Sequence, residues 1–171
     1  MTSAIKTCND NGVYLAQFFR IISETNSADI YQAAKDSAYY IGAVHEDEPA
    51  NGEALVNILL DKGDRDIGLI GWEQGDATWL GRWEGYKAGV DKWNEAHPDD
   101  PAQLSEPQYA GTTSEGGSKA AEALMAADPN LDALIPAGGG GDPLQGAIAA
   151  VERAGKTQDI DIVSTDFLPD L

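Results

Sequence analysis

Two charged side chains follow apolar stretches of the chain and could recognise a polar ligand. Asp166 follows the stretch Ile160–Val163 after Ser164 and Thr165, and Arg20 comes directly after Val13–Phe19. If each stretch is a parallel strand, each side chain lies at a carboxyl end, where open α/β sheets bind small ligands. A carboxylate in such a place can accept hydrogen bonds from two neighbouring sugar hydroxyls. We therefore predict that Asp166 and its counterpart Arg20 contact a small molecule.

The stretch Asp66–Val90 predicts one wall of such a site. Its apolar run Ile67–Ile70 indicates a strand, and large residues that recur at three- and four-residue steps from Trp79 onward indicate a helix. The loop between them carries Trp72 and Gln74. An indole offers a broad apolar surface with one N–H group, so Trp72 can stack on a sugar face. Core packing is the alternative for Trp72 and our expectation for Trp79.

A glycine run, Gly138–Gly141, precedes Asp142 at the expected start of another helix. It lacks the Gly-Lys-Ser/Thr ending of a P-loop, and a carboxylate stands where a phosphate would bind. We interpret the run as a loop that lets a ligand approach the backbone closely, with Asp142 beside it.

Catalysis and metal binding find little support in the residue pattern. The chain has two histidines, no Gly-x-Ser-x-Gly motif and a single cysteine, Cys8, so an internal disulfide and a CxxC zinc site are excluded. The acidic run His45–Glu48 suits a solvated helix start better than a metal site, because metal ligands converge from separate elements. We expect no enzymatic activity, no cofactor and no metal, and we expect Cys8 to be buried and inert.

The excess of acidic over basic residues argues against a nucleic-acid partner. Eleven basic and 29 acidic residues give a net charge of −18, so no basic surface remains to neutralise phosphates. We expect no nucleic-acid partner. The 171 residues are 42% hydrophobic, which suits a globular domain with a core. No apolar run approaches the length of a membrane span, and Met1–Asn9 has no apolar signal-peptide region.

Apolar runs and helical patterns alternate along the chain. Because connections of helical length between short strands imply parallel pairing, we predict an α/β fold whose parallel sheet has helices on both faces. The predicted strands are 13–19, 39–44, 67–70, 108–112, 131–136 and 160–163, and the aromatic and branched residues of the first indicate that it is buried. Helices are expected at 2–11, 27–35, 49–62, 79–97, 118–127 and 142–155. Residues 99–107 read as a polar loop.

Five segments of the chain resemble the type I periplasmic sugar-binding proteins, the ribose- and galactose-binding family, whose fold is shared by LacI-type effector domains. The segments occur in the family's order and spacing over nearly the whole chain. They are Gly12–Arg20, Glu46–Leu55, Arg82–Tyr86, Asp142–Gly155 and Ile162–Asp170.

The resemblance implies two α/β lobes that close on a ligand. It assigns residues 1–38 to the end of the amino-terminal lobe, 39–48 to an interlobe crossover and 49–171 to most of the carboxyl-terminal lobe. The family is about twice as long as this chain, so we expect a fragment or a shortened relative. It also implies a periplasmic, cell-envelope or extracellular location, with the signal sequence lost with a missing amino terminus.

By resemblance, the chain is the solute-binding component of a carbohydrate-type ABC importer, with a sugar-like ligand and a membrane permease as partners. The alternative is the ligand-sensing domain of a transcriptional regulator or membrane sensor, and a small α/β enzyme comes third. Arg20 and Asp166 match common ligand contacts of the family. Phe19 replaces an acid, Leu80 replaces an arginine, and the glycine loop with Asp142 replaces Asn-Asp. These departures point to a different or less polar ligand.

Overall fold

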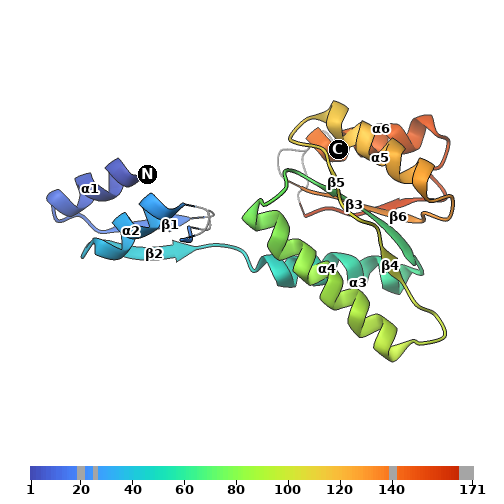
Figure 1. Cartoon of the computed structure of the whole chain (residues 1–171), viewed down its shortest axis with the longest axis horizontal. Helices are drawn as coiled ribbons and strands as arrows, with labels where there is room; N and C mark the ends of the chain where they lie inside the picture. The colour runs from blue at the N-terminus through green and yellow to red at the C-terminus, as the bar shows by residue number, and fades with distance from the viewer. Residues whose placement is uncertain (19–21, 25–26, 139–141, 166–171) are drawn as a thin grey trace. The chain divides into compact units, whose positions relative to one another are not determined.

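The computed structural model describes residues 1–18, 22–24, 27–138 and 142–165. The chain divides into two compact units, Met1–Asp47 and Glu48–Leu171, each with its own parallel sheet (Figure 1). The predicted α/β class, with parallel strands and helices on both faces of a sheet, is confirmed by the second unit. The assignment of residues 1–38, 39–48 and 49–171 to lobes and a crossover stays a prediction.

The described residues of unit 1, Met1–Asp47, form two helices and two parallel strands. The strands pair from Leu15 with Tyr40 to Phe18 with Val44. Helices α1 and α2 pack against each other, and α2 contacts β2. The elements are α1 (Thr2–Asp10), β1 (Leu15–Phe18), α2 (Ala28–Asp36) and β2 (Tyr40–Val44).

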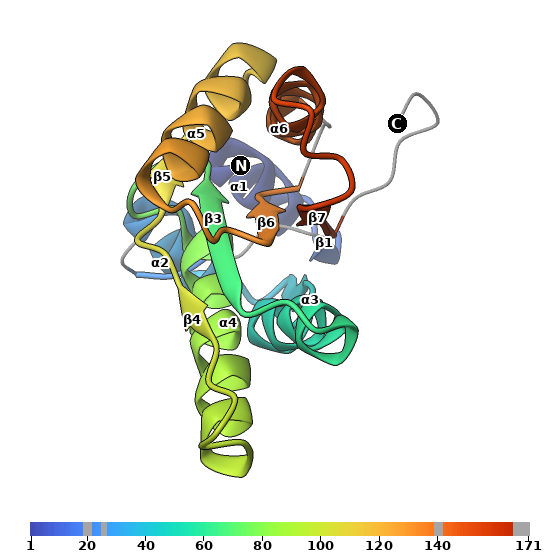
Figure 2. The same cartoon turned by 90° about the vertical axis from the view of Figure 1, so that its right-hand side faces the viewer.

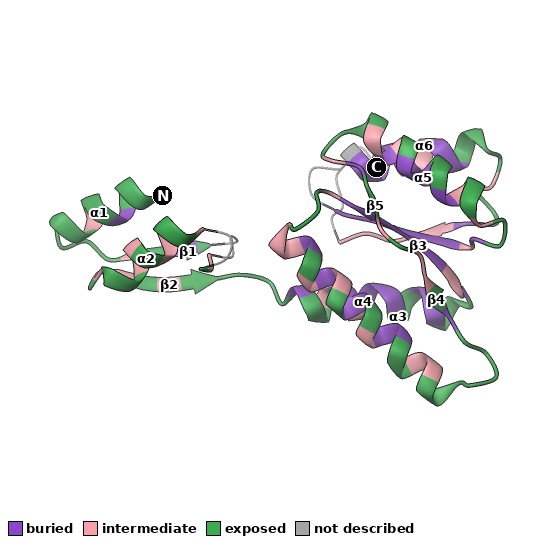
Figure 3. Ribbon diagram, viewed as in Figure 1, coloured by how far each residue is buried: buried purple, intermediate pink, exposed green. Residues whose placement is uncertain are grey.

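Most of the apolar surface of this small sheet is exposed (Figure 3). Tyr14 and Ile41 are 70% and 69% exposed, and of the described residues in β1 only Gln17 is buried. The expectation of a buried strand at Val13–Phe19 is therefore wrong about burial, although β1 does form there. Apolar residues predict a strand, but the described residues of unit 1 leave most of this one exposed. Cys8, expected to be buried, is only partly so.

Unit 2, Glu48–Leu171, holds the larger sheet. Its strand β4 lies inside the segment expected to be a polar loop, where a two-residue strand leaves too short a pattern to detect. The elements are α3 (Glu48–Lys62), β3 (Asp66–Gly71), α4 (Ala77–Ala96), β4 (Gln103–Leu104), β5 (Gln108–Tyr109), α5 (Ser114–Ala127), β6 (Ala133–Pro136), α6 (Asp142–Arg153) and β7 (Asp161–Ile162).

Strand β3 is central to this sheet. Strand β4 pairs with the start of β3, β5 pairs with its end, and β6 pairs along it, followed by β7; every pair is parallel. Between β4 and β5 the ladder is interrupted, and the Ser105 hydroxyl accepts a 2.9 Å hydrogen bond from the Leu69 amide there. The chain thus passes from β3 to β4 and β5 on one side of β3, and then crosses to β6 on the other side. This reversal makes the boundary between β3 and β6 a topological switch point.

Two helix pairs cover the sheet, α3 with α4 on one face and α5 with α6 on the other (Figure 2). Strand β6 illustrates the alternation, since Ala133 and Ile135 join the core under α3 and α4, whereas Leu134 joins the core under α5 and α6. Trp79 is fully buried in the first core, as expected.

Helices α3 and α4 approach closely because glycines line their contact. A Cβ atom at Gly52 would overlap the carbonyl oxygen of Arg82, and one at Gly85 would overlap the carbonyl oxygen of Pro49. The buried face of α4 therefore mixes large residues with glycine and one arginine.

The amino edge of the sheet carries a buried carboxyl group. Burial, reinforced by the nearby carboxylates of Asp161 and Asp132, raises the pKa of Asp64 from 3.8 to about 6. Asp64 Oδ2 is buried without a hydrogen-bond partner. The nearby Lys62 forms its ion pair with Asp161 instead, with Lys62 Nζ 2.5 Å from Asp161 Oδ1.

Replacing Ile41 with lysine should reduce self-association of the 171-residue chain, because it places a charge on the exposed sheet of unit 1. Sedimentation velocity over a range of concentrations measures the effect. Ile58→Lys is the matched control, since Ile58 is an exposed apolar residue on α3 of unit 2. A wild-type chain that stays monomeric and melts in one sharp transition would contradict the expectation.

Gly85→Ala should lower the free energy of unfolding by about 1–3 kcal/mol, since the methyl group has no room between α3 and α4. Urea unfolding followed by circular dichroism measures the change. Glu84→Ala, at the exposed neighbouring position of α4, should leave stability nearly unchanged. Equal stability of the two variants would argue against the close helix contact.

Asp64→Asn should stabilise the chain above pH 6.5 by about 1–2 kcal/mol. Between pH 3.8 and about 6 the folded state keeps the Asp64 proton that the unfolded state releases, so this group's contribution to stability falls as pH rises and is constant above. The asparagine variant has no titrating group at this position, so its stability does not decrease in this way as the pH rises. Urea unfolding from pH 4 to 8 tests it, with the exposed Asp159→Asn as control; parallel pH profiles for wild type and Asp64→Asn would refute it.

Candidate functional site

The loop after β3 lies at the carboxyl edge of the unit 2 sheet. The carbonyl oxygens of Gly71 and Trp72 accept 2.8 Å hydrogen bonds from the amides of Ala110 and Gly111, which follow β5. At the other end of the loop, Asp76 Oδ1 accepts a 2.8 Å hydrogen bond from the Trp79 amide and caps α4. Both ends of the loop are therefore fixed by the fold.

Trp72 and Gln74 occupy this loop differently. Trp72 is partly buried and packs against the core under α3 and α4, and its role in ligand binding stays a prediction. Gln74 is exposed, as is its neighbour Glu73. The amide of Gln74 is free to both donate and accept hydrogen bonds with a ligand at this edge.

An arginine lies behind the loop. Arg82 is only 3% exposed, and its Nε donates a 2.6 Å hydrogen bond to Glu48 Oε2. Its Nη1 donates a 2.9 Å hydrogen bond to Thr165 Oγ1, and its guanidinium carbon lies 5.4 Å from the centre of the Trp72 ring. Arg82 thus joins α3, the β3–α4 loop and the segment after β7.

Glu48 corrects the expectation that the whole acidic run at His45–Glu48 is solvated. His45, Glu46 and Asp47 are exposed, but Glu48 is only 7% exposed. Gly81 allows this, because a Cβ atom there would lie 2.9 Å from Glu48 Cβ, so α4 passes close to the start of α3. A buried carboxylate requires a partner, and Arg82 supplies it.

The sequence reasoning missed this pair. An arginine in an otherwise buried helix face is the signal that could have found it, since a charge there needs an opposite charge nearby. Its acceptor stands 34 residues away in the sequence, and no local pattern connects the two.

The chain after β7 runs toward the same edge. The Val163 amide donates to the carbonyl oxygen of Leu134 at 3.2 Å, and the Ser164 hydroxyl donates to that of Pro136 at 3.3 Å. Thr165, the last described residue, contacts Arg82.

The structure describes only some of the predicted site residues. Trp72 and Gln74 share the loop after β3, as the sequence indicated. Asp142 begins α6, but its side chain lies outside the described part of the chain. Phe19, Arg20 and Asp166 lie outside the described residues altogether. Their roles stay predictions.

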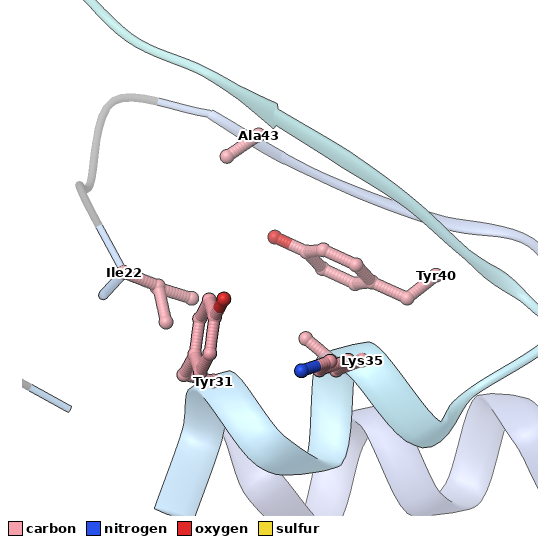
Figure 4. A pocket seen from close by; sticks show the side chains of 6 residues that line it. Ile22, Tyr31, Lys35, Tyr40 and Ala43 are labelled. Carbon is pink, nitrogen blue, oxygen red and sulfur yellow. The ribbon is translucent and has the colours of Figure 1, made fainter. Parts of the chain in front are cut away.

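Unit 1 contains a separate pocket of about 310 Å³ between α2 and β2 (Figure 4). The rings of Tyr31 and Tyr40 border it with Lys35, and the Tyr40 hydroxyl donates a 3.3 Å hydrogen bond to Gln17 Oε1. Its lining is mostly apolar. It is completed by Ile22, Ala34 and Ala43.

The described residues contain no group of three histidine, cysteine, aspartate or glutamate side chains that could hold a metal ion. Within the same residues, no helix is both long and apolar enough to cross a membrane. The raised pKa of the Asp64 carboxyl belongs to the opposite edge of the sheet from Trp72 and therefore concerns stability rather than this site.

The sequence matches the family described as "Periplasmic binding protein domain" over residues 1–171. No curated protein matches it.

Solved structures match the fold at low identity. An ABC transporter solute-binding protein from Agrobacterium vitis with bound D-fucose is 19% identical, with a TM-score of 0.72 over 99% of this chain and 53% of that one. A periplasmic solute-binding protein from Actinobacillus succinogenes with bound D-allose is 18% identical, with a TM-score of 0.74 over 98% and 55%. A transcriptional repressor from Escherichia coli is 17% identical, with a TM-score of 0.74 over 97% and 62%.

The chain therefore spans between about half and three fifths of the length of these solved structures. The likeness to transport proteins and to a repressor is equally close, so it establishes the fold that they share.

Proposed function

Because the chain belongs to the family of periplasmic binding protein domains, we propose that it binds a small, neutral, sugar-like ligand at the carboxyl edge of the unit 2 sheet and performs no chemistry on it. The observation that carries the proposal is the loop after β3, which presents the partly buried Trp72 and the exposed Gln74 at the switch point between β3 and β6.

The topology supports this location. Strand β3 continues into α4 on one face of the sheet, and β6 continues into α6 on the other. Loops that diverge to opposite faces leave a crevice outside the strand ends, which is where open α/β sheets bind ligands.

The residues of the loop suit a sugar. The Trp72 ring combines a large apolar face with a fixed orientation, because the core and Arg82 hold it. Sugar rings present C–H groups on their faces and hydroxyls at their rims, so an indole beneath and an amide at the side match both. Asp166 is proposed as a further hydrogen-bonding partner, and ligand contacts by Arg20, Phe19 and Asp142 stay predictions.

Electrostatics favour a neutral ligand over a phosphorylated one. Glu48 neutralises Arg82, so that arginine offers no net positive charge to an anion. The loop itself carries Glu73 and Asp76, and the whole chain has a net charge of −18. A phosphate group would meet carboxylates at this edge without a compensating cation among the described residues of the loop.

We propose the solute-binding component of an ABC importer as the cellular role, in the periplasm or at the cell envelope, with a membrane permease as the partner. The structural likeness to proteins that bind D-fucose and D-allose supports it. The sensor domain of a regulator is the second candidate, favoured by the likeness to the repressor. The gene sequence upstream separates them, since a secretory or lipoprotein signal supports transport and a helix-turn-helix supports regulation.

Titration calorimetry of the 171-residue chain with D-fucose, D-allose and D-tagatose should show saturable binding of at least one sugar, and glucose 6-phosphate should not bind. Gln74→Ala should weaken that binding about 2- to 10-fold, the value of one or two hydrogen bonds. Trp72→Ala should weaken it about 3- to 10-fold, by loss of stacking.

Two matched controls should bind like wild type. Gln158→Ala changes an exposed glutamine near β7, and Trp93→Phe changes a tryptophan near the carboxyl end of α4. Absence of any heat or fluorescence change with a broad sugar panel would contradict the sugar proposal. Turnover of a sugar that disappears in Asp166→Ala without loss of folding would favour an enzyme instead.

A further inference from the structure

Arg82 contacts a different structural element with each part of its side chain. Nε reaches Glu48 at the start of α3, Nη1 reaches Thr165 after β7, and the guanidinium lies over the Trp72 ring in the β3–α4 loop. The separation of 5.4 Å between the guanidinium carbon and the ring centre is within the range of a cation–π contact. Two of these three elements form the carboxyl edge of the sheet.

Helix packing alone does not account for an arginine at this position. The other buried residues of α4, among them Trp79, Tyr86 and Val90, are mainly apolar or glycine. Burying an ion pair removes two charges from water, and apolar residues of similar volume often replace such pairs without loss of stability. An arginine here instead provides direction, because its planar group makes several contacts in a fixed geometry.

We propose that Arg82 is a positioning residue of the ligand site. Glu48 fixes the guanidinium, and the guanidinium in turn holds the Trp72 ring and the Thr165 side chain in the orientation that they present at the carboxyl edge. The importance of this orientation for ligand binding rests on the proposed function.

The division of roles follows from the geometry. Glu48 takes Nε and supplies the compensating charge, which leaves Nη1 directed to Thr165 and a face of the guanidinium toward Trp72. A lysine at position 82 could pair with Glu48, but a single ammonium group cannot also span the other two contacts. Thr165 directly precedes Asp166 in the sequence, so its restraint acts one residue from a predicted ligand contact.

Fluorine NMR of the chain labelled with 5-fluorotryptophan tests the restraint without any ligand. The four tryptophan resonances are assigned by single phenylalanine substitutions. Arg82→Lys should shift and broaden the Trp72 resonance and leave that of Trp93 unchanged. Thr165→Val, which removes one hydrogen bond at nearly constant volume, should move the Trp72 resonance less and in the same direction, and Thr165→Ser should restore it.

Sugar affinity supplies the second readout. Arg82→Lys should weaken binding of D-allose, or of whichever panel sugar binds wild type, about tenfold, since a hydrogen bond to a charged group is lost. Thr165→Val should also weaken it, and Thr165→Ser should bind within twofold of wild type. Lys92→Met is the matched control, because the Lys92–Glu53 pair also joins α4 to α3, at 2.6 Å, without touching the loops.

The outcomes separate the two proposals. An unchanged Trp72 resonance in both Arg82→Lys and Thr165→Val overturns the positioning role, whatever the sugar affinities are. Equal losses of affinity in Arg82→Lys and Lys92→Met also overturn it, since they would indicate a general effect of helix packing. A wild-type chain that binds none of the sugars overturns the proposed function alone, and the NMR comparison then still decides the role of Arg82. Thr165→Val keeps the test decisive if Arg82→Lys does not fold.

Discussion

The close contact between α3 and α4 is the constraint on which the rest of unit 2 depends. Glycines at positions 52 and 85 let the two backbones touch, and Gly81 lets α4 pass the side chain of Glu48. At that distance the carboxylate and the guanidinium of Arg82 meet in a site with almost no water. Side chains larger than glycine at these positions would push the helices apart and strain the buried ion pair between them.

The same contact determines what the carboxyl edge of the sheet can do. A tryptophan in a loop loses conformational entropy when it is held still, so a loop that binds through an aromatic ring gains affinity when the fold restrains that ring beforehand. Here the guanidinium of Arg82, whose charge Glu48 neutralises, restrains the Trp72 ring from the protein side. The exposed polar groups of the loop remain available to a ligand. The charge of Arg82 thus serves the architecture and adds little attraction for anions.

Local patterns in the sequence predicted the order of the helices and of every strand except β4, the end of α3 next to Gly63, where φ is positive, and the burial of Trp79. These features depend on residues close in sequence. The partners of Arg82 stand 34 and 83 residues away, and β4 has only two residues, so no periodicity reveals them. In unit 1 the apolar residues predicted the strand correctly but overestimated its burial, because composition does not show what lies over a strand.

The interruption between β4 and β5 affects how the sheet of unit 2 meets its surroundings. An uninterrupted outer strand offers a row of free amides and carbonyls to which another chain can add a strand. Here the outer row consists of two two-residue strands separated by Ser105, Glu106 and Pro107, and the Ser105 hydroxyl already accepts the hydrogen bond of the Leu69 amide. Proline has no amide hydrogen to offer. This side of the sheet therefore offers few backbone groups in a continuous row to which another strand could add.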